Sequence, residues 1–282
     1  MHIEHALDAY PPTPNGLHVL RFQFDQTVMA RVNLVKILWL QGFPDQARRM
    51  VEQSLQSAVE VEHELSITYV LAYAACRTAL ITGDLPGAER YLAMLSRQAL
   101  INPLQQWTLM SQCWKGAILS RQGDAASAAK VLAAAVEQIP EGSFSLHHTR
   151  FLGELAFAMA RSGEPVKALE TVNRALDIGE RRNDRWFQAE LFRLSGEIVL
   201  MVGGPNAVAV AEARFQQALD LAIRQGALSW ELRAATSLAQ LKRDHGRRTE
   251  ARALLYGVYA RFTEGFATSD LRAAKGLLDS LA

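Results

Sequence analysis

The chain has 282 residues, of which 49% are hydrophobic and 21% charged, as in water-soluble globular proteins. Its 30 basic and 29 acidic residues leave a formal net charge of +1, too little for a long-range field that would hold a nucleic-acid backbone. No run approaches about 18 uninterrupted apolar residues. We therefore expect neither direct binding of nucleic acid by this segment nor a membrane span.

The amino-terminal segment carries acids and prolines without an apolar run, so it is not a secretion signal. EHALDAY resembles the end of an earlier helix, and we interpret residues 1–28 as the remnant of a preceding repeat or linker in a fragment of a longer protein. LHVLRFQF, residues 17–24, is short enough to form either a strand or a helix.

Beyond this segment, apolar residues recur with helical spacing and strand signals are nearly absent. The chain contains two cysteines, Cys76 and Cys113, both inside helical patterns, which favours buried thiols in a reducing, cytoplasmic compartment over a disulfide. The predicted helices are 27–41, 45–62, 66–82, 86–99, 104–122, 125–138, 146–162, 165–181, 185–202, 206–225, 229–245, 248–262 and 270–281.

Six short segments between these helices share a pattern that repeats about every forty residues. Each begins with a glycine, which adopts positive φ without strain and suits the residue just past a helix end. An alanine follows five of the glycines by five residues, whereas Val208 stands there in the Gly203 copy, where a three-residue insertion would make Ala211 equivalent. The structural repeat positions are Gly42 and Ala47, Gly83 and Ala88, Gly123 and Ala128, Gly163 and Ala168, Gly203 and Ala211, and Gly246 and Ala251.

A helix pair cannot bury its own apolar face, but stacked pairs can. Twelve residues before each alanine the side chain is often small, which would let paired helices cross closely. These positions are Val35, Cys76, Gly116, Ala156, Val199 and Ala239, with Gly196 as the alternative to Val199. We predict an all-α fold: a right-handed α-solenoid of about six to seven antiparallel helix pairs, forming a single domain over 1–282 with 270–281 as a carboxy-terminal capping helix.

This order of small and large residues resembles the tetratricopeptide repeat. The large residues are Val51, Leu92, Leu132, Val172, Phe215 and Leu255, and Pro140 stands where that family often ends a repeat. The period is longer than the family's usual length of about thirty-four residues. The tryptophan and tyrosine usual in the first helix are mostly missing, so the sequence resembles a longer-helix, tetratricopeptide-like variety.

Three segments, 186–200, 211–241 and 246–281, resemble the helical tail of large bacterial regulators. In those proteins a winged-helix DNA-binding domain or a class III nucleotide cyclase domain precedes an AAA-type ATPase module, and tetratricopeptide-like repeats follow. The resemblance implies a non-catalytic module that binds a protein or peptide segment, including other domains of the same protein, in transcriptional or signalling control.

The same resemblance implies that the first helix of each pair lines a concave face. Counting from each turn glycine gives the binding candidates Lys36, Tyr73, Arg77, Arg150, Phe157, Glu190, Arg193, Glu197, Arg233 and Gln240. For Tyr73 and Arg77, four residues apart, the alternatives are ligand binding and surface packing. For Glu190, Arg193 and Glu197 they are binding and an ion-pair network on a solvated helix face.

Side chains that usually carry chemistry are scarce or scattered. The sequence has neither a G-x-x-x-x-G-K-[ST] phosphate loop nor a G-x-S-x-G elbow, and the cysteines lack C-x-x-C spacing. We expect no enzyme activity, metal or cofactor. His147 and His148 are predicted to lie at the solvent-facing start of a helix, and Trp107, Trp186 and Trp230 to pack between repeats.

The sequence leaves two functions open. One is an interaction module that docks an acidic or extended partner segment on the face bearing Tyr73, Arg77, Arg193 and Arg233. The other is a small-molecule sensor in which a ligand occupies the groove and changes the pitch of the solenoid. A further alternative is that the module is the tail of a class III adenylate or guanylate cyclase.

Overall fold

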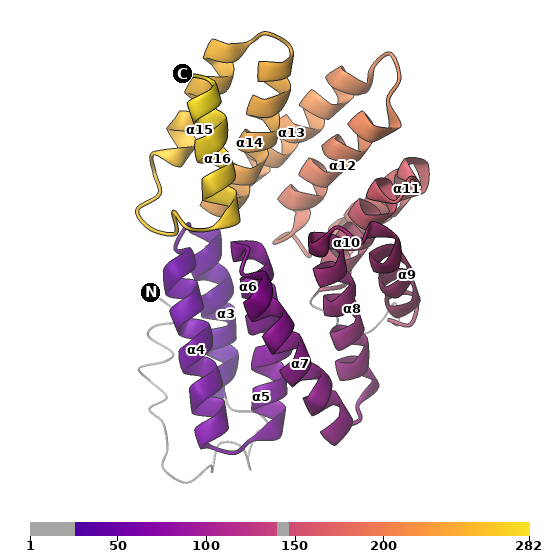
Figure 1. Cartoon of the computed structure of the whole chain (residues 1–282), viewed down its shortest axis with the longest axis vertical. Helices are drawn as coiled ribbons and strands as arrows, with labels where there is room; N and C mark the ends of the chain where they lie inside the picture. The colour runs from indigo at the N-terminus through magenta and orange to yellow at the C-terminus, as the bar shows by residue number, and fades with distance from the viewer. Residues whose placement is uncertain (1–25, 140–146) are drawn as a thin grey trace.

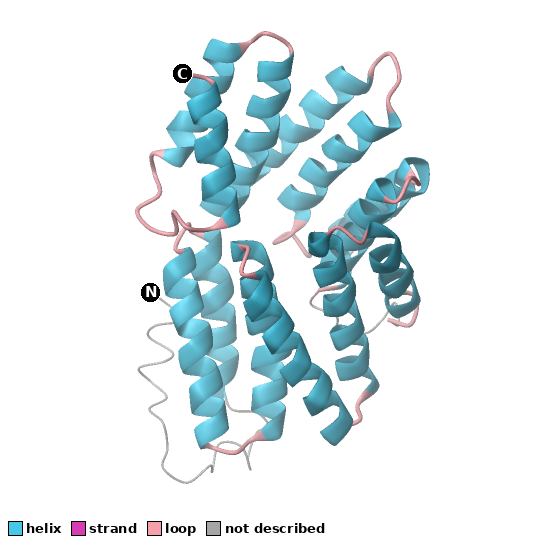
Figure 2. Ribbon diagram, in the orientation of Figure 1, coloured by secondary structure: helices cyan, strands magenta, loops and turns pink. Residues whose placement is uncertain are grey.

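A computed structural model describes residues 26–139 and 147–282, which form helices joined by short turns, with no strand in these ranges (Figures 1 and 2). The ambiguous run 17–24, the segment EHALDAY and Pro140 lie outside the described residues. The expectation of an all-helical chain is confirmed for the part that the structure describes.

The helices lie close to the predicted ranges, and α11 has the predicted bounds. In chain order they are α3 (Gln26–Leu40), α4 (Pro44–Glu60), α5 (Glu64–Val70), η1 (Leu71–Ala75), α6 (Cys76–Thr82), α7 (Leu85–Ile101), α8 (Gln105–Gln122), α9 (Ala125–Val136), α10 (His148–Arg161), α11 (Pro165–Arg181), α12 (Gln188–Val202), α13 (Ala207–Gln225), α14 (Leu228–Asp244), α15 (Arg248–Tyr259) and α16 (Ser269–Ser280).

The predicted helix 66–82 contains a local irregularity. The run Glu64–Thr82 is helical throughout, but its middle, η1, has π-helical hydrogen bonding. A π-turn inserts an extra residue into the helix. The four-residue spacing of Tyr73 and Arg77 therefore does not correspond to one regular α-helical turn, as the sequence interpretation assumed.

The turn pattern is confirmed at all six glycines. Their φ angles are positive, from 76° at Gly203 to 96° at Gly163. The Gly203 turn is longer than the others, because Gly204 also has positive φ and α13 begins only at Ala207. Ala211 is fully buried, like the other five repeat alanines, so the inferred insertion is correct.

Paired helices cross closely at the small residues. A Cβ on Gly116 of α8 would lie 2.5 Å from Cγ of Leu132 on α9. In the same way, a Cβ on Gly196 of α12 would lie 2.5 Å from Cε1 of Phe215 on α13. Gly196, rather than Val199, is thus the small residue of its pair.

Each helix packs against the next along the chain, as is typical of a helical repeat, and α16 covers α14 and α15. The packing continues around the molecule until its two ends meet (Figure 1). Helix α14 contacts α3, and α16 contacts α6. The row of helices therefore closes on itself around an inner face.

Polar groups hold this end contact together. Helix α4 has no side-chain cap of its own at its start, and the carboxylate of Glu264 accepts hydrogen bonds from the backbone N–H groups of Asp45 (2.8 Å) and Gln46 (2.9 Å). The Asp45 carboxylate in turn accepts from the N–H of Gly265 at 2.9 Å. A carboxylate at a helix start satisfies N–H groups that lack intrahelical partners. Glu264 thus caps a helix more than two hundred residues away.

Apolar contacts complete the closure. The rings of Trp39 and Trp230 meet edge to face with centroids 4.5 Å apart, and the Ser229 hydroxyl donates to the Trp39 carbonyl oxygen. A Cβ on Gly42 would lie 2.7 Å from Cδ2 of Leu228. The backbone at this turn therefore sits against α14 too closely for a side chain.

Among the described residues, one helical run is long and apolar enough to cross a membrane by length and composition. It is Glu64–Thr82, and 83% of its most apolar window is buried inside the protein. That degree of burial is typical of a core helix in a soluble protein.

Candidate functional site

The binding candidates lie on the first helix of each pair, as predicted. Lys36 is on α3, Tyr73 in η1 and Arg77 on α6, while the remaining candidates lie on α10, α12 and α14. Two of them take no part in the clusters described below. Phe157 lies beneath the guanidinium of Arg161, and the side chain of Gln240 donates to Asp244.

Aromatic rings form a continuous chain of contacts around the inner face. His147 is its centre, with ring centroids 5.4 Å from Tyr73, 6.0 Å from Trp114 and 5.5 Å from Trp186. Trp186 leads to Trp230 at 6.5 Å, which meets Trp39 of the first helix pair. The chain therefore joins helices from both ends of the molecule.

Two indole groups fasten neighbouring helix pairs to each other. The Trp114 N–H donates to the carbonyl of Ala72 at 2.9 Å, and the Trp230 N–H donates to the carbonyl of Trp186 at 2.8 Å. Buried tryptophans need such acceptors for their N–H groups. The prediction that the tryptophans pack between repeats is confirmed for Trp186 and Trp230, and also for Trp107, whose ring lies 6.1 Å from that of Tyr73 in the preceding pair, measured between centroids.

Four side chains beside this aromatic chain form what we call the cationic cluster: Lys36, Arg77, His147 and Arg150. Arg77 is 3% exposed, Arg150 1% and His147 3%. Arg150 lies with its guanidinium carbon 4.7 Å from the ring centroid of Trp114. Lys36 places its ammonium 5.8 Å from that of Trp186. Cations in these positions are attracted by the electron-rich ring faces.

The cationic cluster is poorly supplied with acceptors. Among the described residues, no hydrogen-bond partner reaches Nη2 of Arg77 or Nε and Nη1 of Arg150. Arg150 has a 3.5 Å ion pair with Glu154, but that carboxylate is already held bidentately by Arg121 at 2.8 and 3.1 Å. Buried polar groups are normally satisfied, so this concentration of unpaired donors is unusual.

Burial and like charge shift the pKa values in the cluster. Burial and, to a smaller extent, the nearby Arg150 lower the pKa of Arg77 to about 9. Burial also lowers the pKa of Arg150, to about 10, against the opposing effect of Glu154. The pKa of His147 falls well below its ordinary value, first through burial and then through Arg77, Arg150 and Lys36. His147 is therefore neutral at neutral pH.

A second group of charges on the inner face is fully paired. We call it the paired network: Glu190, Arg193, Glu197, Arg233 and Asp270. Glu190 accepts two hydrogen bonds from Arg193, both 2.8 Å, and one from Arg233 at 2.9 Å. Arg193 also reaches Glu197 at 3.2 Å, and Arg233 reaches Asp270 at 3.2 Å. Each guanidinium thus contacts two carboxylates.

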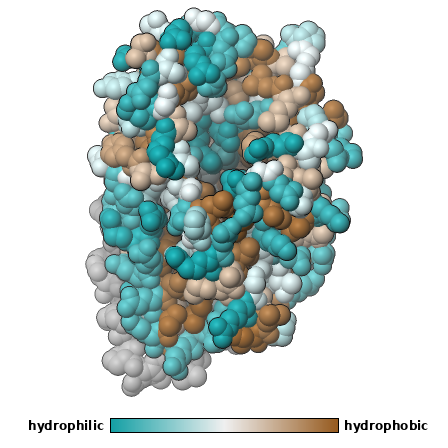
Figure 3. Space-filling model, viewed as in Figure 1, coloured by the Kyte–Doolittle hydropathy of each residue, from teal (hydrophilic) through white to brown (hydrophobic). Residues whose placement is uncertain are grey.

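The ion-pair network, one of the two alternatives for Glu190, Arg193 and Glu197, is present in the structure. The expected solvated position is wrong for Glu190, which is 4% exposed because Arg233 of α14 closes over it. Neighbouring Arg193 and Arg233 line a hollow of about 150 Å³ with Thr236, Ser237 and Asp270. Figure 3 shows the same face of the molecule as Figure 1, hollowed near its middle with hydrophilic residues along the hollow.

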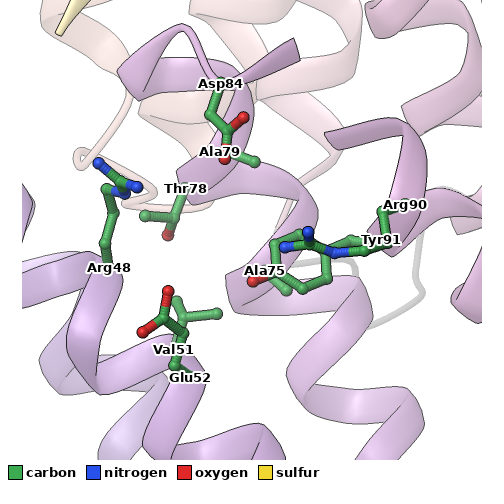
Figure 4. A pocket seen from close by; sticks show the side chains of 9 residues that line it. All are labelled: Arg48, Val51, Glu52, Ala75, Thr78, Ala79, Asp84, Arg90 and Tyr91. Carbon is green, nitrogen blue, oxygen red and sulfur yellow. The ribbon is translucent and has the colours of Figure 1, made fainter. Parts of the chain in front are cut away.

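Another hollow, of about 190 Å³, lies between α4, α6 and α7 (Figure 4). None of the binding candidates lines it. Arg48, Glu52 and Arg90 are exposed there, and Asp84 caps the start of α7 by accepting from the N–H of Gly87 at 3.0 Å. Its charges are of both signs and mostly solvated, which sets it apart from the inner face.

Sequence reasoning misjudged the two histidines. His147 and His148 are buried rather than solvent-facing, because the chain enters α10 through the centre of the aromatic chain. A signal was present: His147 stands sixteen residues before Gly163, as Trp107 stands before Gly123 and Trp230 before Gly246. The repeat register therefore assigned His147 to an interior aromatic position.

Both cysteines are buried and free, as expected. Burial raises the pKa of the Cys113 thiol to about 12, and burial also raises the pKa of Cys76. The two groups are protonated and therefore poor nucleophiles. Among the described residues, no three histidine, cysteine, aspartate or glutamate side chains lie together as a metal would require.

No protein-family model matches the sequence, and no curated protein matches it significantly. Among solved structures, the fold is similar to a Signal Transduction ATPase with Numerous Domains (STAND) protein with a tetratricopeptide repeat sensor, PH0952 from Pyrococcus horikoshii. The TM-score is 0.51 at 12% identity, and the match covers 93% of this chain and 43% of the archaeal one, so this chain spans less than half of that protein. BtubC (BKLC) from P. vanneervenii aligns over 70% of this chain and 87% of its own, with 16% identity and a TM-score of 0.46.

Proposed function

We propose that this chain is a non-catalytic sensor module built as a right-handed superhelix of six helix pairs capped by α16, and that its inner face recognises a small molecule. One observation carries the proposal. The two ends of the helix row meet, and they enclose an inner face on which charged and aromatic side chains from α3, α6, α8, α10, α12 and α14 are buried together. Such convergence of polar groups among apolar rings is typical of small-molecule sites.

The depth of the inner face favours a small molecule over an extended segment. Arg77, Arg150 and Glu190 are each at most 4% exposed. An extended acidic segment from a partner, or from the protein's own effector domains, would reach them only after the end contact opened. In that alternative, weakening the contact with Glu264→Ala would increase binding of the segment.

The end contact supplies a way to report occupancy. It depends on a few hydrogen bonds to Glu264 and Asp45 and on the Trp39–Trp230 pair. A ligand that binds one curvature of the row more tightly shifts the population towards that curvature. We infer that the hydrogen bonds between Glu264 and the start of α4 would then become stronger or weaker.

The setting of the module rests on resemblance. The description of the archaeal structure names a repeat sensor in a multidomain ATPase, and the sequence resembles the repeat tail of bacterial regulators. These features support a cytoplasmic module of a transcriptional or signalling regulator, with the tail of a class III cyclase as the alternative. Its protein partners would then be other domains of the same chain.

A two-stage experiment tests the sensor role. The chain is first screened by thermal denaturation against a defined set of sugars, amino acids, organic acids and nucleotides, because a ligand of the folded state raises the midpoint. Hydrogen exchange of residues 44–47 and 264–266 is then measured with each stabilising compound. The proposal predicts at least one compound that raises the midpoint and changes exchange at the end contact. Compounds that bind without changing that exchange would contradict it, as would a screen with no stabilising compound.

A further inference from the structure

We propose that the cationic cluster binds a small organic oxyanion: the carboxylate or phosphate-ester group of a molecule that carries a flat ring. This inference deepens the sensor role and rests on it. The anionic group would lie among Arg77, Arg150 and Lys36, with His147 beside it, and the ring would contact the aromatic chain.

The charge balance around the cluster points to an anion. Lys36, Arg77, Arg150 and Arg121 bring four positive charges. Among the described residues, the carboxylates that act on them are Glu154 and Asp184 and, from the paired network, Glu190 and Asp270, which already pair with Arg193 and Arg233. Glu154 is shared by two arginines, and Asp184 also accepts from the hydroxyl of Thr149 at 2.9 Å. A buried cation without a counter-charge is costly. An oxyanion would supply the missing negative charge.

The unpaired donors have the chemistry that recognises an oxyanion. The free positions are Nη2 of Arg77 and both Nε and Nη1 of Arg150, among the residues that the structure describes. Guanidinium N–H groups bind carboxylate and phosphate oxygens strongly, and a planar fork can hold two oxygens at once. The donors come from α6 and α10, so a single anion would join two helix pairs.

The surrounding rings indicate the rest of the ligand. Tyr73, Trp114 and Trp186 lie within 5.4 to 6.0 Å of the His147 ring, measured between centroids. Aromatic side chains favour stacked or edge-to-face contact with other flat rings. A ligand with its anionic group among the cations would therefore place an attached ring against these side chains.

The paired network is the internal control for this interpretation. It lies on the same face and contains the same types of residue, yet each of its guanidinium groups contacts two carboxylates. Unpaired cations are thus not a general property of the inner face. Among the residues that the structure describes on this face, the unpaired guanidinium nitrogens belong to the cluster beside His147.

The first measurement is thermal denaturation of the whole chain in sodium chloride, inorganic phosphate, sodium benzoate and adenosine monophosphate at equal ionic strength. The proposal predicts a saturable rise of at least about 3 °C with benzoate or the nucleotide, larger than with inorganic phosphate. A rise with benzoate alone identifies a carboxylate ligand, and a rise with the nucleotide alone identifies a phosphate ester. Equal midpoints in all four salts would overturn the proposal.

The second measurement compares Arg77→Met with Arg174→Met, which removes an exposed arginine of α11. Arg77→Met should melt in chloride at the same temperature as the wild type or higher, because a buried unpaired charge is removed, and it should lose the rise with the anion. Arg174→Met should retain the rise. A midpoint of Arg77→Met several degrees below wild type in chloride, or a rise that persists in it, would overturn the proposal.

The outcomes separate this inference from the sensor role. If no anion raises the midpoint but a neutral compound does so and alters exchange at residues 44–47, the oxyanion site fails and the sensor role stands. If an anion binds through Arg77 without altering that exchange, the site stands and the sensor role fails.

Discussion

The two charged groups of the inner face contain similar residues and differ in how they are balanced. In the paired network, Arg193 and Arg233 share Glu190 and each has a further carboxylate. In the cationic cluster, Arg77 has no ion pair among the described residues and Arg150 shares its partner with Arg121. Burial is comparable at Glu190, Arg77 and Arg150.

The comparison separates charges that complete the fold from charges that are available to a ligand. A buried ion pair with full hydrogen bonding holds its helices in register, and breaking it leaves a charge that nothing compensates. A buried cation without a partner contributes little to the stability of the chain alone. Mutations in the paired network and in the cationic cluster should therefore change the free energy of unfolding by different amounts, and even in opposite directions.

The largest effect is expected from Glu190→Gln. The substitution leaves Arg193 and Arg233 without their shared carboxylate, which should lower the free energy of unfolding by about 3–5 kcal/mol. Equilibrium denaturation in urea measures the loss. The control Glu170→Gln, at an exposed position of α11, should change the free energy of unfolding by less than about 0.5 kcal/mol. A loss below about 1 kcal/mol at Glu190 would show that the network does not stabilise the fold.

The pH dependence of stability tests the charges of the cationic cluster. His147 has a depressed pKa because it is buried and lies near Arg77 of α6, Arg150 of α10 and Lys36 of α3. Below about pH 6.5 this histidine binds a proton in the unfolded chain but not in the folded chain. The free energy of unfolding should therefore fall as the pH is lowered from 6.5 to 5, by up to about 1.4 kcal/mol for each pH unit.

His147→Phe should flatten that part of the profile, measured in chloride by denaturation at each pH. His245→Gln, which changes an exposed histidine after α14, should leave the slope as in the wild type. An unchanged slope in His147→Phe would mean that His147 is protonated in the folded chain and that the cations do not act on it.

The third prediction concerns the contact that brings the two ends together. Glu264→Ala removes the acceptor of two backbone N–H groups at the start of α4 and should cost about 1–2 kcal/mol. Glu164→Ala is the matched control, since Glu164 stands at the start of α11 without capping it. Thermal denaturation of both variants checks the difference, and equal midpoints would show that the end contact contributes nothing.

The smallest effect is expected from Arg150→Met. Glu154 keeps its bidentate partner Arg121 in this variant, and the methionine can pack against Trp114 and Phe187. The free energy of unfolding in chloride should stay within about 1 kcal/mol of the wild type. A loss as large as that predicted for Glu190→Gln would remove the distinction between the two groups.

The sequence alone was sufficient for the elements and their pairing. Helix bounds, turn glycines and small crossing residues are encoded locally, by apolar spacing and by positions that exclude a Cβ. Gly203 shows the limit of counting, because its insertion shifts Val199 into the place that Gly196 fills. The intrahelical pairs of Arg193 follow from spacing in the same way.

The contacts that define the site depend on segments far apart in the chain. Nothing in the sequence near Asp45 indicates that Glu264 caps its helix, since the two meet only when the row of helices closes. The burial of Glu190 under Arg233 follows from the packing of α12 against α14, which lie about forty residues apart in the chain. The π-turn at Leu71–Ala75 also carries no signal in its residue types, which would form a regular α-helix equally well.

The most direct test of the closed row is amide hydrogen exchange at Asp45 and Gln46. First-turn amides have no intrahelical acceptor, so those of Val166 and Lys167 in α11, which also begins at a proline, are the internal reference. If Glu264 caps α4, Asp45 and Gln46 exchange more than about tenfold more slowly than the reference in the wild type and lose this protection in Glu264→Ala. Equal rates in the wild type would mean that the ends do not meet and that the inner face is an open groove.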